Sequence, residues 1–231
     1  MIGIIGAMDK EVNDIIALMS EVKKQEVAGM IFHAGILNGC KVVVVRSGIG
    51  KVNSAACTQI LIDKFDVEKI IDTGIAGGLA EKVNIGDIVI SKDAIQHDFD
   101  TTIFGDQPGE ITNMHIREFP ADDELIDIAK KSCDEAVPDV TYHVGRILTG
   151  DRFISNDDVK ARLREVFDGT CAEMEGAAIA HVAYINRVPF VIIRAISDKA
   201  GSDAYIAYDE FQDEAINRFV KLLYTMVSKL A

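Results

Sequence analysis

Residues 171–198, CAEMEGAAIAHVAYINRVPFVIIRAISD, hold two changes of pattern that decide the fold. The first part predicts a short strand that runs straight into a helix, with the junction at Glu173–Glu175. The second part, from Val188, is almost wholly apolar until it ends on the polar pair Ser197 and Asp198. Such a run predicts a strand buried on both faces by helices. The order strand, helix, buried strand is typical of an α/β protein.

The rest of the chain repeats this alternation of apolar runs and amphipathic stretches. Asn38-Gly39 is a strong hairpin signal, so an antiparallel ribbon is predicted within a mixed sheet. Residues 98–120 are polar and punctuated by Gly and Pro, which predicts a long loop. Strands are predicted at residues 2–5, 31–32, 42–45, 69–73, 86–97 and 141–148, helices at 12–19, 122–136, 157–167 and 208–230, and glycine turns at 47–50, before a further helix, and at 74–78.

The composition favours one soluble domain spanning residues 1–231. The chain is 48% hydrophobic, and its length suits a single α/β domain. The 37 acidic and 24 basic side chains give a net charge of -13, which repels nucleic acids and anionic membrane surfaces. We therefore expect neither as a partner.

The amino terminus and the cysteines indicate a cytoplasmic protein. The first residues, MIGIIGAMDKE, lack a basic leader, and no apolar run approaches the roughly 18 residues of a membrane span. The four cysteines, scattered without a C-x-x-C pair, are expected to be reduced and buried. A metal site is not predicted.

Candidate site residues lie where the predicted strands end, because ligands of open α/β sheets bind beyond the carboxyl ends of the strands. The glycine turns could hold phosphate, but neither matches a phosphate-binding loop, and plain tight turns are the stronger interpretation. The polar or glycine-rich ends are Gly6–Met8 followed by Glu11, 47–50, 74–78, Arg194–Asp198 and the junction 173–175.

Three carboxyl groups at these ends have both a functional and a structural interpretation. Asp198 follows an apolar strand, where desolvation would raise its pKa and suit an acid, yet a helix cap is equally compatible. Glu175 could bind a ribose diol, and Glu11 could act nearby, but both also fit charges in the first turn of a helix. His97 and His181 have no ligand spacing, and no serine lies in a nucleophile elbow, so both histidines are interpreted as structural.

Six blocks in order along nearly the whole chain resemble the bacterial methylthioadenosine/S-adenosylhomocysteine nucleosidase family. They are GIIGAMDKEV, SGIGKVNSA, TGIAGGLA, TGDRFI, AEMEGAAIAHVA and VIIRAISD. The resemblance implies a purine nucleoside phosphorylase-like α/β fold with a mixed, partly closed sheet flanked by helices. It also implies a homodimeric hydrolase that releases adenine from methylthioadenosine and S-adenosylhomocysteine, with 5′-deoxyadenosine as a further substrate, in methionine salvage, without metal or cofactor.

The resemblance also implies roles for particular residues. Asp198 would protonate adenine N7, and Glu11 would activate the attacking water, with Ser197 and Arg194 ordering that part of the site. Glu175 would accept hydrogen bonds from the ribose hydroxyls. The other implied substrate-binding residues are Met174 beneath the sugar, Phe153 and Ile154 at the base, Met8, Ile49 and Tyr208 around the sugar and its 5′ substituent, Ala7 and Gly77 at strand ends, and Thr101 and Phe104 from the neighbouring subunit.

Departures from the family pattern leave the 5′ preference open. Ile75 stands where a serine is usual, and Tyr208 where a phenylalanine is usual. Three alternatives remain. A phosphorylase is disfavoured because the Glu11 carboxylate would repel phosphate, and a non-catalytic nucleoside-binding protein is disfavoured because Asp198 and Glu11 are both present. The third alternative is a hydrolase of aminodeoxyfutalosine or adenosine monophosphate.

Overall fold

The computed structural model describes residues 1–201 and 204–230, without the side chains of 206–210 and 212–215. The strands are β1 (Ile2–Gly6), β2 (Ser20–Val27), β3 (Met30–Leu37), β4 (Cys40–Arg46), β5 (Lys69–Gly78), β6 (Ile88–Gln96), β7 (Phe119–Pro120), β8 (Tyr142–Thr149), β9 (Cys171–Glu173) and β10 (Phe190–Asp198). The helices are α1 (Asp9–Ala17), α2 (Lys51–Phe65), the 3-10 helix η1 (Thr102–Phe104), α3 (Asp123–Ala136), α4 (Asp157–Phe167), α5 (Gly176–Asn186) and α6 (Ala204–Ser228).

Five strands close into a ring, and four more extend the sheet from it. The ring runs in the order β10-β6-β8-β9-β5, and β5 also pairs with β10. From β5 the sheet continues through β1, β4, β3 and β2, and the short β7 pairs with β6. β1 is parallel to β4 and β5, whereas β2, β3 and β4 form an antiparallel meander. The predicted mixed, partly closed sheet is therefore confirmed.

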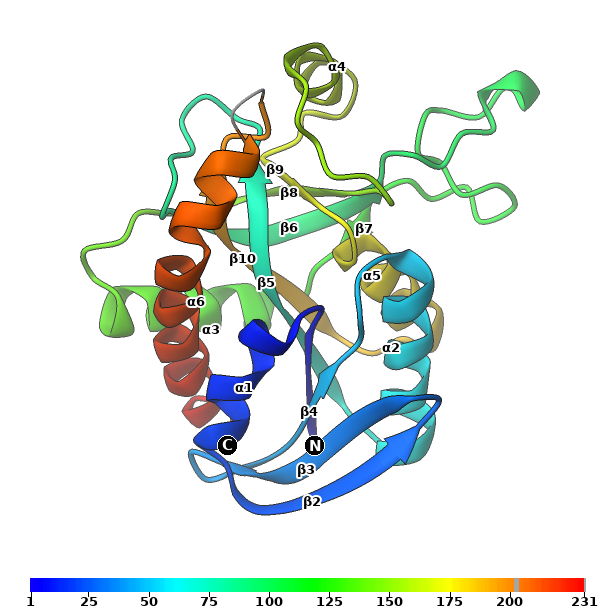
Figure 1. The fold of residues 1–231 in the computed structure, drawn as a ribbon. Helices are drawn as coiled ribbons and strands as arrows, with labels where there is room; N and C mark the ends of the chain where they lie inside the picture. Colours follow the sequence, from blue (N-terminus) through cyan, green and yellow to red (C-terminus); the bar gives the residue numbers. More distant parts are fainter. Residues whose placement is uncertain (202–203, 231) are drawn as a thin grey trace.

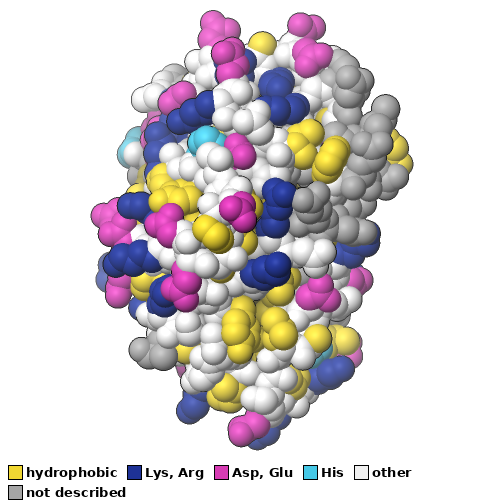
Figure 2. All heavy atoms as spheres, turned by 90° about the vertical axis from the view of Figure 1, so that its left-hand side faces the viewer, with side chains coloured by type: hydrophobic (Ala, Val, Ile, Leu, Met, Phe, Trp, Pro, Cys, Tyr) yellow, Lys and Arg dark blue, Asp and Glu magenta, His cyan; other side chains and the backbone are white. Residues whose placement is uncertain are grey.

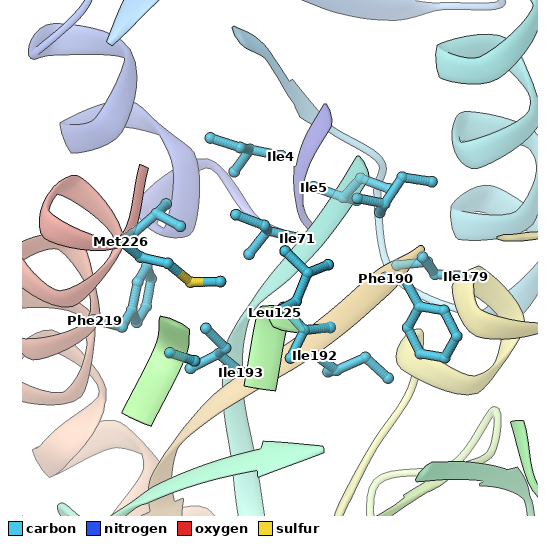
Figure 3. Close-up of a cluster of buried hydrophobic side chains, with 14 of the residues drawn as sticks. Ile4, Ile5, Ile71, Leu125, Ile179, Phe190, Ile192, Ile193, Phe219 and Met226 are labelled. Atoms are coloured by element: carbon cyan, nitrogen blue, oxygen red, sulfur yellow. The ribbon is translucent and has the colours of Figure 1, made fainter. Parts of the chain in front are cut away.

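Helices cover the sheet from two sides, with α2 and α5 packed together on one side and α1, α3 and α6 on the other (Figure 1). Figure 3 shows isoleucines of β1, β5 and β10 among side chains from α3, α5 and α6. Ile71 of β5 and Ile192 of β10 are fully buried, and burying such a side chain stabilises the fold by about 1.5–3 kcal/mol. Two of the strands that carry predicted site residues are thus anchored in the core.

The structure has a strand, β2, that the sequence did not predict, and α1 ends at Ala17 instead of Met19. Residues 20–27 are SEVKKQEV, almost all exposed, at one edge of the sheet. An edge strand that faces solvent needs no apolar alternation, and its lysines discourage pairing with other chains. The hairpin at Asn38-Gly39 is confirmed, and both residues have positive φ, 45° and 86°.

The glycine turn predicted at 74–78 is wrong, because these residues continue β5 to its end and pair with β10 and β9. Glycine is needed there for close approach. A Cβ on Gly74 would lie 2.6 Å from Glu11 Oε1, and a Cβ on Gly77 would lie 2.8 Å from Asp198 Oδ1. The end of β5 therefore leaves space for the two carboxyl groups.

Two further predictions concern the 98–120 loop and the last helix. Residues 98–118 form an arm that projects from the body of the molecule (Figure 1). It contains η1 and a single bridge between Ile111 and Ile116, so the long loop is confirmed except for the short β7 at its end. α6 begins at Ala204, before the predicted start at residue 208, because the helix extends beyond the apolar stripe from which it was predicted.

Acidic and basic side chains are interspersed on the face shown in Figure 2, which carries the left-hand side of Figure 1. Both signs of charge are thus present on this face, although the chain as a whole has a net charge of -13. Among the described residues, no helix combines the length and the apolar character needed to cross a bilayer.

Candidate active site

A cavity of about 310 Å³ lies at the carboxyl ends of β1, β5 and β10, next to the junction of β9 and α5. This is the position at which α/β sheets bind small ligands. The predicted site residues in its lining are Ala7, Met8, Glu11, Ile49, Gly77, Phe153, Met174, Glu175, Ser197 and Asp198, and the other lining residues are Ile75, Ala76, Ala172, Glu173 and Tyr205.

Glu11 lies in the first turn of α1 and is 3% exposed. Its Oε2 accepts hydrogen bonds from the amides of Ala7 and Met8, at 2.7 and 2.9 Å, and its Oε1 accepts one from the amide of Ile75 at 3.2 Å. The first-turn interpretation is thus partly right, but the third bond ties the carboxylate to β5. Burial raises the pKa of Glu11, while the Arg194 charge and the amides act in the opposite direction.

Asp198 ends β10 and is 1% exposed. Its Oδ2 accepts a hydrogen bond from Ser197 Oγ at 2.9 Å, and its Oδ1 accepts one from the Ala200 amide at 2.7 Å. The Ala200 amide precedes α6, so this bond is a local turn and the described contacts do not make Asp198 a helix cap. Burial raises the pKa of Asp198, which favours a protonated carboxyl that can act as an acid.

The Glu175 side chain does not cap its own helix. Its Oε1 accepts a hydrogen bond from the Gly50 amide at 2.8 Å, and Gly50 has φ 96°, a conformation that favours glycine. The amides of Glu175 and Gly176 instead donate to Glu173 Oε2, at 3.1 and 2.7 Å. Burial, aided by the Glu173 charge, raises the pKa of Glu175 to about 8. Glu175 stands at the N-cap position of α5, so its charge does lie at a helix start, but its side chain binds the first amide before α2 instead of capping α5.

Arg194 is 2% exposed and lies behind the cavity lining. Its Nη2 donates to Asp72 Oδ2 and to Glu173 Oε2, and these charges keep its pKa well above the ordinary arginine value despite burial. Sequence reasoning placed Glu173 at the junction of strand and helix but missed its ion pair with Arg194, and it missed Asp72. The only signal for Asp72 was a charged residue inside an otherwise apolar strand.

The remaining predicted residues lie outside the cavity lining. Ile154 is buried behind it and lines a small adjoining space of about 30 Å³ together with Phe153. Thr101 and Phe104 lie on the arm, where Thr101 Oγ1 donates to Asp106 and the Phe104 side chain is 81% exposed. The Tyr208 side chain falls outside the described residues.

Nothing in the described residues brings three or more His, Cys, Asp or Glu side chains together as a metal site. His97 and His181 do not line the cavity, and His181 stacks on Phe119. All four cysteines are buried and free, as predicted. Burial raises the pKa of the Cys133 thiol to about 12, which makes it a poor nucleophile.

The fold and the site define a member of the phosphorylase superfamily, whose family model matches residues 1–228. The chain is 41% identical over 227 residues to the 5′-methylthioadenosine/S-adenosylhomocysteine nucleosidase of Bacillus cereus (strain B4264), covering 96% of this chain and 97% of the relative. The chain belongs to this nucleosidase family.

Solved structures agree with this assignment. The nucleosidase of Colwellia psychrerythraea 34H, in complex with adenine, has a TM-score of 0.95 at 38% identity and covers 99% of this chain and 95% of its own. The futalosine hydrolase of Helicobacter pylori strain 26695 has a TM-score of 0.93 at 31% identity and covers 99% of this chain and 97% of its own. The same fold thus serves a second hydrolase.

Proposed function

We propose that this protein hydrolyses the N-glycosidic bond of 5′-methylthioadenosine and S-adenosylhomocysteine, releasing adenine and the 5-thioribose product. The observation that carries the proposal is the pair of buried carboxyls, Glu11 and Asp198, in the lining of one cavity. One can act on the leaving base and the other on water, the division of labour known from glycoside hydrolysis. The family relationship supports the same reaction.

Asp198 is proposed as the acid that protonates adenine N7, so that the base departs as a neutral molecule. Its raised pKa supports this role, because the carboxyl must hold a proton at the pH of the reaction. Ser197 donates to Oδ2, and the Ala200 amide donates to Oδ1. These bonds fix the orientation of the carboxyl toward the cavity.

Glu11 is proposed to hold and activate the attacking water. Three amides already donate to its carboxylate, so its geometry is set before substrate binds. A carboxylate has about four lone-pair sites, which leaves room for a bond from water. Its negative charge also stabilises the positive charge that develops on the ribosyl ring in a dissociative reaction.

The other lining residues are proposed to position the nucleoside. Glu175 would accept hydrogen bonds from the ribose hydroxyls, with Met174 beneath the sugar. Phe153 would stack on the adenine, and the Ile154 backbone would bind the adenine edge. Ile75 adds an apolar side chain to the lining, and its own amide binds Glu11. We expect this side chain to disfavour polar substrate groups in that part of the cavity.

Adenine release from methylthioadenosine by the purified protein, with and without phosphate, tests the proposed function. We expect equal rates in both buffers, because Glu11 places negative charge where a phosphorylase would bind phosphate. Release that requires phosphate would make the protein a phosphorylase. Activity on aminodeoxyfutalosine alone would favour the function of the Helicobacter pylori neighbour, and tight nucleoside binding without any turnover would indicate a binding protein.

We also propose that the protein is a single-domain cytoplasmic enzyme of methionine salvage. It is proposed to form a homodimer in which the arm of one subunit completes the active site of the other. Ile103 and Phe104 at the tip of the arm are 88% and 81% exposed, which suits burial in an interface. Sedimentation should give twice the mass of the chain. A Phe104→Ala variant should raise KM more than it lowers kcat, and a monomeric, fully active wild type would contradict the proposal.

A further inference from the structure

The polar cluster that extends from the cavity lining to the residues behind it contains more acid than base. Four carboxyl groups, those of Glu11, Asp72, Glu173 and Glu175, act on the single guanidinium of Arg194. Asp72 is 1% exposed and Arg194 is 2% exposed, so water screens these charges little. Full ionisation would leave a large excess of buried negative charge, and such carboxyls titrate as a coupled group.

The register of β5 and β10 places Asp72 and Arg194 on the same face of the sheet. Asp72 pairs with Ile192, and Arg194 pairs with Gly74. The two charged residues are therefore two positions apart along the paired strands, and side chains two positions apart point to the same face. Because Gly74 has no side chain, the guanidinium can pass over it. A Cβ there would lie 3.2 Å from Arg194 Nη1 and 2.6 Å from Glu11 Oε1, so both atoms flank the same glycine.

Arg194 is held from one end only. Nη2 donates to both Asp72 and Glu173, whereas Nε and Nη1 have no hydrogen-bond partner among the described residues. The Nη2 end is bound to Asp72 and to the cavity-lining Glu173, and Nη1 and the Glu11 carboxylate both lie beside Gly74. Asp72 itself does not line the cavity.

We propose that Asp72 is a positioning residue for the hydrolysis: together with Glu173 it fixes Arg194 beside Glu11 and sets the charge that Glu11 experiences. This inference rests on the proposed function. Asp72 touches no substrate, so it acts through Arg194. The titratable groups that face Asp72 are Arg194 from β10, Glu173 from β9, Glu11 from α1, Cys57 from α2 and Glu175 from the start of α5.

An Asp72→Asn variant tests the inference through the pH profile of kcat/KM. Asparagine keeps the shape but cannot ionise, so Glu11 no longer titrates against the Asp72 charge, and the acid limb should move to lower pH. We expect kcat to fall about tenfold, because Arg194 loses one of its two charged partners and is held less firmly beside Glu11, while KM stays within about twofold. An acid limb that coincides with that of the wild type would overturn the inference.

Asp93→Asn is the matched control. Asp93 binds Arg146 through two hydrogen bonds, at 2.7 and 2.9 Å, and is partly buried on the same sheet, but neither residue lines the cavity. This variant should lose stability without moving the pH profile. If Asp72→Asn does not fold, Asp72→Ser is measured in its place, with the same shift expected.

A stability measurement separates failure of this inference from failure of the proposed function. Burial raises the pKa of Asp72 to about 7, so the folded protein binds a proton that the unfolded chain, with a pKa of about 4, releases. The Asp72 contribution to stability is therefore present at low pH and is lost as pH rises from about 4 to about 7. Relative to the wild type, the urea midpoint of Asp72→Asn should be higher at pH 8 than at pH 5, and equal differences at both pH values would overturn the inference even if no adenine is released.

Discussion

Replacing Asp198 by asparagine should reduce kcat for adenine release by about 10²–10⁴-fold, the range of general acid catalysis. Asparagine has nearly the same shape but cannot protonate the leaving base. The substitution leaves Glu11 and Glu175 in place, so KM should change little. Steady-state rates with methylthioadenosine measure both parameters, and adenine binding by calorimetry checks that the cavity is intact.

The pH dependence adds a second test of the acid. Burial raises the pKa of Asp198, and the proposed role requires the protonated form, so wild-type kcat should fall as pH rises through that pKa. The Asp198→Asn variant should lack this basic limb. The Asp93→Asn variant, which changes a carboxyl remote from the cavity, should retain it. An Asp198→Asn protein with wild-type kcat would exclude Asp198 as the acid.

Replacing Glu11 by alanine should reduce kcat by a similar factor, about 10²–10⁴-fold, through loss of the group that activates water. Alanine is preferable to glutamine here. Three amides donate to the Glu11 carboxylate, and the NH₂ group of glutamine would place a donor against at least one of them.

Rescue distinguishes lost chemistry from a disturbed site. Formate is small enough to enter the space that Glu11→Ala leaves, and it should restore part of kcat in a concentration-dependent way. The same formate should not increase the activity of Asp198→Asn, because that variant lacks an acid and keeps its base. Unchanged activity of Glu11→Ala without formate would mean that another group activates the water.

The sequence predicted the central elements well because their patterns reflect burial. Residues 188–196 are almost wholly apolar, and the structure makes Phe190–Asp198 a fully buried strand of the ring. β2 could not be predicted in this way, since an exposed edge strand has no apolar face. The turn predicted at Gly74–Gly78 was wrong for a different reason. Local sequence does not distinguish a glycine that allows the chain to turn from a glycine that leaves space for another side chain.

The site residues likewise divide into those that local sequence could predict and those that depend on strand pairing. Residues at strand ends could be predicted from their position and from the family resemblance, and most of them line one cavity. Asp72 and the ion pairs of Arg194 were missed because their arrangement depends on the pairing of β5 with β10. Asp72 and Arg194 are 122 residues apart in sequence, and only the closed ring brings them together.

The bulge near the end of β10 makes the position of Asp198, the proposed acid, sensitive to the number of residues before it. The pairing with β5 shifts between Ile196 and Asp198, so two consecutive residues, Ser197 and Asp198, both line the cavity. In a regular strand consecutive side chains point to opposite faces. Relatives that carry a one-residue insertion or deletion at this point would keep every proposed catalytic residue in their sequence and still misplace the proposed acid. Alignments of this segment should therefore be judged by their gaps as well as by their identities.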